Sequence, residues 1–343
     1  MKVDSNYSHL NFETRQTLDW SIEARMKYNW EDVWIPYKAA DRILGNLKRM
    51  INRPRSLRPL NALILGPSGN GKSSLLGRLL DSYPPEKVDA PGLPEGALVL
   101  GASGNGKSSL LNQLGIENPR FGVPWGWITP VVPVITPANA NERSILSGLL
   151  HGLKAPYSKH DTTGDLYDRL VNGLDACQTR IVTVDELHNM MRGGKRADES
   201  LRVLKNISSI LGIPMIYAGT EDALRVLRYD RQLASRVTIF RLPLWENNEE
   251  LEYLLRMREG SISLRKASRL WKEPKRSRIF KFSQVFDSDP EPKSGILDNI
   301  LKLVKLSSDE ALLDGSEEIT IAHLNKVAEE YGWHEAHEEP DEV

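Results

Sequence analysis

Two glycine-rich segments of this chain carry the same residue pattern, Gly-x-x-x-x-Gly-Lys-Ser, and begin 35 residues apart. The first runs from Gly66 to Ser73 and the second from Gly101 to Ser108. In this pattern the glycines let consecutive backbone N–H groups face phosphate oxygens, the lysine reaches the outer phosphates, and the serine hydroxyl binds Mg²⁺. Each segment follows a short apolar run and precedes a helical pattern, which is the context that the chemistry requires. The chain is therefore predicted to bind a nucleotide with Mg²⁺.

The two copies are nearly identical from Ala62–Leu79 to Ala97–Leu114, which indicates a recent tandem duplication or an artificial alteration of the sequence. The candidate nucleotide-binding residues of the first copy are Gly66, Pro67, Ser68, Gly69, Asn70, Gly71, Lys72, Ser73 and Ser74. Those of the alternative copy are Gly101, Gly104, Asn105, Gly106, Lys107, Ser108 and Ser109. Which copy binds nucleotide stays open from the motif alone.

Further along, the apolar run Ile181–Val184 ends in Asp185 and Glu186. Downstream of a P-loop, such a run is typical of a Walker B strand. Asp185 would then hold Mg²⁺ together with Ser73, and Glu186 would accept a hydrogen bond from the attacking water. Thr220, which follows the next apolar run, is placed to contact the γ-phosphate or that water. His188 and Asn189 are interpreted as structural or hydrogen-bonding residues, since no metal-ligand partner stands at a suitable spacing.

Apolar runs alternate with helical patterns between residues 61 and 246, which predicts an α/β core with a parallel sheet and helices on both faces. We expect an N-terminal arm and helix over 1–60 and a small helical lid over 247–332, followed by an acidic tail over 333–343. The duplicated segment lies at about 97–115, within the core.

Composition narrows the possible classes of protein. The net charge is −1, so any contact with nucleic acid must come from a local basic patch. Such patches occur near residues 48–58, near residues 265–278, and at Arg192, Lys195 and Arg196. We take the last three residues as the first candidates for DNA contact. The single cysteine, Cys177, excludes an internal disulfide. No apolar run reaches the length of a membrane span, and a cytoplasmic location is expected.

Taken together, these stretches resemble AAA+ ATPases of the initiator type and, among them, the TniB/TnsC family of transposition-regulating ATPases. The resemblance covers about residues 30–331, and its motifs are Trp34–Tyr37, Gly66–Ser73, Val184–Asn189, Ile213–Thr220, Gln232–Arg236, Leu264–Ser268 and Ser294–Thr320.

The resemblance implies an ATPase that binds ATP and Mg²⁺ between neighbouring subunits. It also implies a homo-oligomer, a ring or filament on duplex DNA, which engages a DDE-type transposase and a TniQ-type targeting protein. Trp34 and Tyr37 would line the adenine pocket and Thr220 would act as sensor 1. Arg236, with Arg231 as the second choice, would reach the γ-phosphate of a neighbouring subunit.

Two features depart from the family pattern. The family has one P-loop, whereas this chain has two: the upstream motif favours Lys72, and the spacing to Asp185 favours Lys107. The lid segment at Ser294 also carries no arginine at the sensor-2 position. Three other functions remain open: a replication initiator or helicase loader, a P-loop kinase, and a binding module that has lost catalysis.

Overall fold

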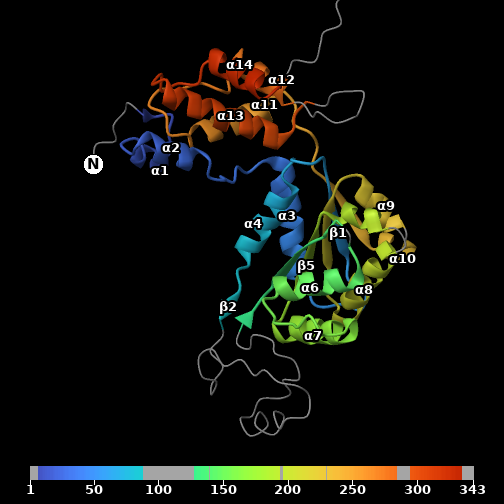
Figure 1. The fold of residues 1–343 in the computed structure, drawn as a ribbon. Coiled ribbons are helices and arrows are strands. Elements are labelled where there is room, and N and C mark those ends of the chain that lie inside the picture. Colours follow the sequence, from blue (N-terminus) through green and yellow to red (C-terminus); the bar gives the residue numbers. More distant parts are fainter. Residues whose placement is uncertain are drawn as a thin grey trace, which may run out of the picture. The chain divides into compact units, whose positions relative to one another are not determined.

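The computed structural model describes residues 7–87, 127–138, 140–193, 196–228, 230–283 and 294–333. They form two compact units, each described by itself (Figure 1). The sheet unit comprises residues 41–66 and 72–242, and the helical unit comprises residues 1–40, 67–71 and 243–343. In the described ranges no helix combines the length and the apolar character that a membrane crossing demands.

The sheet unit is built on five parallel strands in the order β4-β5-β6-β1-β7. Their bounds are β1 Asn61–Leu65, β4 Val131–Ile135, β5 Ile181–Asp185, β6 Met215–Gly219 and β7 Val237–Arg241. Every residue of β1, β5 and β6 is buried, because helices cover both faces of the sheet. This arrangement confirms the expected parallel α/β core.

Side chains alternate between the two faces, and β1 shows this directly. Leu63 and Leu65 belong to the larger apolar cluster with helices α6 to α9. Ala62 and Ile64 are equally buried but lie outside that cluster, so they face the opposite side of the sheet. The helices of this unit are α3 Lys38–Ile51, α4 Lys72–Ser82, α6 Glu142–Gly152, α7 Thr163–Ala176, the 3₁₀ helix η2 Leu187–Gly193, α8 Arg196–Leu211, α9 Asp222–Arg228 and α10 Arg231–Ala234.

A separate two-stranded ladder joins β2 Glu86–Lys87 to β3 Trp127–Ile128 in antiparallel register. Glu86 lies opposite Ile128, and Lys87 lies opposite Trp127. Residues 87 and 127, which border the undescribed segment 88–126, therefore lie side by side. The second P-loop copy, from Gly101 to Ser109, lies in that interval, outside the described residues.

The helical unit packs residues from both ends of the chain around one apolar cluster. Its helices are α1 Phe12–Gln16, α2 Ile22–Asn29, α11 Glu249–Glu259, α12 Lys275–Phe282, α13 Leu297–Leu313 and α14 Ile321–Glu330. Helix α13 contacts α2, α12 and α14. Residues 7–40, which the sequence placed in an N-terminal arm, thus fold together with the C-terminal helices.

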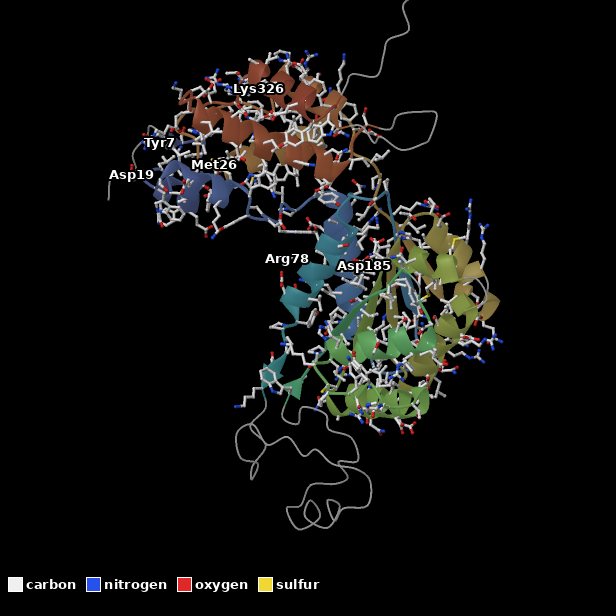
Figure 2. The ribbon with its side chains drawn as sticks, in the orientation of Figure 1. Tyr7, Asp19, Met26, Arg78, Asp185 and Lys326 are labelled. Atoms are coloured by element: carbon white, nitrogen blue, oxygen red, sulfur yellow. The ribbon has the colours of Figure 1, made fainter. Side chains whose placement is uncertain are left out.

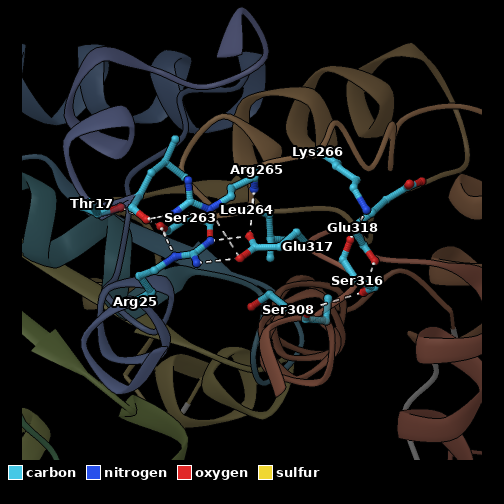
Figure 3. A network of polar contacts seen from close by, with 12 residues as sticks. Thr17, Arg25, Ser263, Leu264, Arg265, Lys266, Ser308, Ser316, Glu317 and Glu318 are labelled. Carbon is cyan, nitrogen blue, oxygen red and sulfur yellow. Dashed lines mark hydrogen bonds and ion pairs between the residues drawn. The ribbon is translucent and has the colours of Figure 1, made fainter. Parts of the chain in front are cut away.

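A buried ion pair fastens α2 to the C-terminal helices (Figure 3). The Arg25 side chain is 4% exposed and donates two hydrogen bonds to the Glu317 carboxylate, at 2.7 and 2.5 Å. It also donates to the hydroxyl and the carbonyl of Ser263, and Thr17 donates to the same hydroxyl at 2.6 Å. This full set of partners offsets the desolvation of a buried guanidinium.

Candidate nucleotide-binding site

The first glycine-rich segment directly follows β1, an interior strand between β6 and β7, and precedes α4. Gly69 has φ +70° and Gly71 has φ +83°, in the left-handed region that glycine adopts without strain. These two residues turn the backbone so that it enters an 11-residue helix at Lys72. The N-terminus of such a helix, preceded by a glycine-rich turn, favours phosphate because its N–H groups are unpaired and its dipole is positive there.

Lys72 lies at the start of this helix with its side chain only 4% exposed. Its ammonium group donates to the Gly66 carbonyl at 2.9 Å, across the loop. Burial lowers the pKa of Lys72, and the nearby carboxylates of Glu186 and Asp185 act in the opposite direction. A buried ammonium group beside two carboxylates is a position where phosphate oxygens gain a close positive charge in a low-dielectric environment.

Asp185 ends β5 beside the first turn of α4 and is labelled in Figure 2. Its Oδ2 accepts a hydrogen bond from the Ser73 hydroxyl at 2.6 Å, and its Oδ1 accepts from the Glu186 N–H at 2.8 Å. The structure therefore brings together the two residues that the sequence predicts as Mg²⁺ ligands. A hydroxyl and a carboxylate oxygen suit this hard cation.

The described residues contain no cluster of three or more His, Cys, Asp or Glu side chains that could hold a metal ion. Ser73 and Asp185 would hold Mg²⁺ together with oxygens of a nucleotide or water, which is the usual way in which proteins bind this ion.

Glu186 directly follows β5 and has φ +54°, which is uncommon for a residue other than glycine. Its Oε2 lies 3.0 Å from the Nε2 of His188, and its side chain is 34% exposed. The other ring nitrogen of His188 is buried without a hydrogen-bond partner in the described structure. Hence His188 contacts the carboxylate that the sequence singles out as the residue acting on water. The sequence indicated a structural or hydrogen-bonding histidine but did not identify Glu186 as its partner.

The other predicted residues of the sheet unit lie at strand ends. Thr220 follows β6, is half-buried, and accepts a hydrogen bond from the Ala223 N–H through its backbone carbonyl. Arg236 immediately precedes the edge strand β7, where its carbonyl accepts from the Asn61 N–H at 2.9 Å. Arg236 is half-buried and makes no ion pair within the described ranges. The Arg231 side chain is outside the described part.

The tip of the loop, residues 67–71, belongs to the helical unit. The Gly69 carbonyl accepts from the Asp298 N–H at 2.9 Å, and the Asn70 side chain donates to the Pro243 carbonyl at 2.7 Å. A Cβ atom on Gly69 would lie 3.1 Å from the Asp298 side chain. The first turn of α13 thus contacts the loop, with an aspartate there and no arginine.

The predicted adenine-pocket residues lie in the same unit. Trp34 and Tyr37 are both half-buried, and Ile35 between them is buried in the apolar cluster. The Tyr37 ring packs on Trp245 with 4.9 Å between the ring centroids. The tyrosine hydroxyl would lie 3.9 Å from a Cβ atom on Gly71, so this aromatic pair adjoins the glycine-rich loop.

The candidates for DNA contact divide into three groups. Lys195 lies outside the described residues, as do the side chains of Arg192 and Arg196. In the 265–278 cluster three cations form ion pairs within the unit, through the contacts Arg265–Glu317, Lys275–Glu318 and Arg276–Glu252. In the 48–58 cluster only Arg55 has an ion-pair partner among the described residues, namely Asp175.

Solved structures with the same fold come from the origin-recognition proteins. The Aeropyrum pernix ORC2 protein, solved as ADPNP and ADP complexes, superposes with a TM-score of 0.58 at 17% identity, over 89% of this chain and 71% of that chain. The A. pernix ORC1 protein in complex with DNA superposes with a TM-score of 0.57 at 15% identity, over 89% of this chain and 69% of that chain. Cdc6p from Pyrobaculum aerophilum superposes with a TM-score of 0.55 at 15% identity, over 88% of this chain and 70% of that chain. At such identity the likeness shows the fold, an AAA+ P-loop NTPase core with a helical lid.

No curated protein matches the chain. The family model described as bacterial TniB protein matches residues 25–93 and 89–247, which together exceed half of the chain. The two ranges meet between the P-loop copies, so that each copy lies in a different range. The match thus includes the glycine-rich loop, the Asp185–Glu186 pair and Arg236. The chain belongs to the TniB family of bacterial proteins.

Proposed function

We propose that this protein is an ATP-dependent regulator of transposition that oligomerises on duplex DNA, recruits a transposase and hydrolyses ATP. One observation carries the nucleotide part of the proposal: Lys72, Ser73, Asp185 and Glu186 converge at the carboxyl ends of β1 and β5. Membership in the TniB family, together with a fold shared with a protein solved in complex with DNA, supports the remainder.

In the proposed reaction the loop N–H groups and Lys72 bind the phosphates of ATP. Glu186 accepts a hydrogen bond from the attacking water, and Thr220 contacts that water or the γ-phosphate. Bound Mg²⁺, held by Ser73 and Asp185, would neutralise charge on the phosphate oxygens. Phosphoryl transfer depends mainly on positioning and charge neutralisation, so this set of side chains suits the reaction.

The site is completed by a neighbouring subunit in this proposal. Arg236 lies at an edge of the sheet unit without an ion-pair partner in the described structure, as an arginine that reaches another subunit requires. Assembly into a ring or filament around DNA would then depend on ATP. The proposed partners are duplex DNA, a DDE-type transposase and a TniQ-type targeting protein, and the likeness to ORC and Cdc6 structures favours a replication-initiator role as the second candidate.

The test is negative-stain imaging of ATP-dependent assembly on duplex DNA for the parent, Lys72→Ala and Lys107→Ala. Because the first copy follows the interior strand β1 and lies beside Asp185, we expect Lys72→Ala to abolish assembly and Lys107→Ala to retain it. Loss in Lys107→Ala alone would move the site to the second copy. A parent that binds ATP but never assembles would contradict the oligomer.

A transposition assay separates the two candidate functions. With a DDE-type transposase and a TniQ-type protein present, the parent should stimulate strand transfer, and Lys72→Ala should not. If the parent assembles on DNA but leaves strand transfer unchanged, the replication-initiator role is favoured instead.

A further inference from the structure

Positive charge is concentrated in helix α3 and the residues that directly follow it. Residues 38–58 contain seven basic residues and one acidic residue, Asp41, in a chain whose net charge is −1. This segment therefore carries a formal charge of +6, and the rest of the chain carries −7. Such a contrast creates a local positive field that the net charge conceals.

Helix α3 orders part of this charge into a stripe. Arg42, Asn46, Arg49 and Arg53 follow at separations of four, three and four residues, the spacing of one helix face. The helix ends at Ile51, and the Asn52 N–H still bonds to the Lys48 carbonyl, so Arg53 continues the last turn. At about 1.5 Å per residue, the stripe extends over about 16 Å.

The opposite face of α3 holds the helix on the sheet unit. Ile43, Leu47 and Met50 are at most 6% exposed. The basic residues of the stripe are all exposed, and Asn46 accepts a hydrogen bond from the Arg49 guanidinium at 2.9 Å while donating to the Arg42 carbonyl. The apolar face therefore fixes the direction in which the stripe faces solvent.

In the 265–278 cluster, Arg265, Lys275 and Arg276 pair with carboxylates. By contrast, none of Arg42, Lys48, Arg49, Arg53 and Arg58 forms an ion pair in the described structure. We call these five residues the α3 basic surface. We infer that the α3 basic surface binds the phosphate backbone of duplex DNA. This inference rests on the proposed function and adds the surface at which DNA would be held.

The partner follows from charge and geometry. Duplex DNA carries about one negative charge per 1.7 Å of helix axis, so a rigid stripe of about 16 Å can meet several phosphates at once. Arginine suits phosphate because its planar guanidinium can donate two parallel hydrogen bonds. Phosphate contacts carry no sequence information, so this surface would strengthen binding to all duplexes equally.

The test compares two triple variants that lose the same charge. The first is Arg42→Gln/Arg49→Gln/Arg53→Gln. The matched control is Arg269→Gln/Lys272→Gln/Lys281→Gln, whose residues are likewise exposed cations without an ion pair in the described ranges. Fluorescence anisotropy gives the affinity of the full-length protein for a labelled duplex at several salt concentrations, with a non-hydrolysable ATP analogue present. Binding of a fluorescent nucleotide checks that each variant is folded.

For the first variant, the slope of log affinity against log salt concentration should fall by about 2 to 3, since each phosphate contact contributes about 0.9. The control should keep the parent slope. An unchanged slope in the first variant, or an equal fall in both variants, overturns the inference. So does a loss of ATP-dependent self-association without DNA at an unchanged slope, since the surface would then face a second copy of the chain. A parent that binds no duplex overturns the DNA-binding proposal itself.

Discussion

At the scale of single residues, the contact between Glu186 and His188 is the least expected feature of the site. Glu186 has an uncommon backbone conformation, and one oxygen of its carboxylate lies 3.0 Å from His188. The contact restricts where the other oxygen can point. In the proposed reaction that second oxygen accepts the hydrogen bond from water, so His188 acts as a positioning residue for Glu186.

The corresponding prediction concerns kcat. His188→Ala should lower kcat for ATP hydrolysis on the order of 10-fold to 100-fold, because a misplaced catalytic group is costly, while the Kd for ATP stays unchanged. His188→Gln keeps an N–H donor and should recover most of the rate. The measurement is steady-state hydrolysis together with nucleotide titration of both variants. Equal loss of rate in the two variants, or a parallel loss of ATP binding, would contradict the positioning role.

Much of the site at this scale follows from local sequence, because the chemistry depends on short motifs. Gly69, Lys72 and Ser73 lie next to one another in the chain, and a strand that ends in Asp-Glu is recognisable by itself. The contact of His188 with Glu186 was not predicted, since it depends on the side-chain direction set by the positive φ of Glu186. The spacing of the two residues was the available signal.

At the scale of elements, the ion pair between Arg25 and Glu317 joins α2 to the segment that precedes α14. Burial by itself would raise the pKa of Glu317, but the hydrogen bonds and charge of Arg25, together with Arg265, hold that pKa below its ordinary value of 4.5. Folding therefore favours the ionised carboxylate. The stabilisation is complete above pH 4.5 and is lost as the pH falls through the lowered folded-state pKa.

Glu317→Gln should therefore lower the stability of the protein near pH 7, because Arg25 stays buried without a countercharge, a loss that typically costs about 3 to 5 kcal/mol. Its effect should shrink as the pH falls from 4.5 through the lowered folded-state pKa of Glu317, below which the parent carboxylate is itself protonated. Thermal unfolding of parent and variant across this pH range checks the prediction. Glu318→Gln is a suitable control, since Glu318 is more exposed and pairs with Lys275. A stability difference that does not change with pH would contradict the assigned origin.

The strands and helices of the core were largely predictable from their patterns. The apolar run that ends in Asp185 appears as β5 with nearly the expected bounds. Strand β7 was not predicted, because its residues are half-exposed or exposed at the edge of the sheet and show no continuous apolar run. Helices α1 and α2 are short, and their role becomes visible only through contacts with residues more than 200 positions away, such as Arg25 with Ser263.

At the scale of the whole molecule, the proposal that Arg236 of one subunit acts on ATP bound by its neighbour leads to a specific prediction. Arg236→Ala should bind ATP like the parent but hydrolyse it at least about 1,000-fold more slowly, the usual contribution of an arginine supplied by a neighbour. An equimolar mixture of Arg236→Ala and Lys72→Ala should regain activity. In that mixture an intact ATP site on one subunit can meet an intact Arg236 on the next.

The measurement is the ATPase rate of each variant alone and of the mixture, on duplex DNA at equal total protein. Arg225→Ala is the control for loss of an exposed arginine, since Arg225 pairs with Asp222 on its own helix. If the mixture assembles on DNA but stays inactive, or if Arg236→Ala alone retains the parent rate, Arg236 does not act between subunits.

The sequence by itself determined the chemistry of this protein, because phosphate binding and Mg²⁺ coordination need particular residue types at short, fixed spacings. It also determined the parallel α/β core and the family, through alternating apolar runs and motifs that extend along most of the chain. The tertiary structure alone decided which distant groups meet. It joined Ser73 to Asp185, His188 to Glu186, and the N-terminal helices to the C-terminal ones. The physical reason is that these contacts depend on strand order and side-chain direction, which packing of the whole core sets.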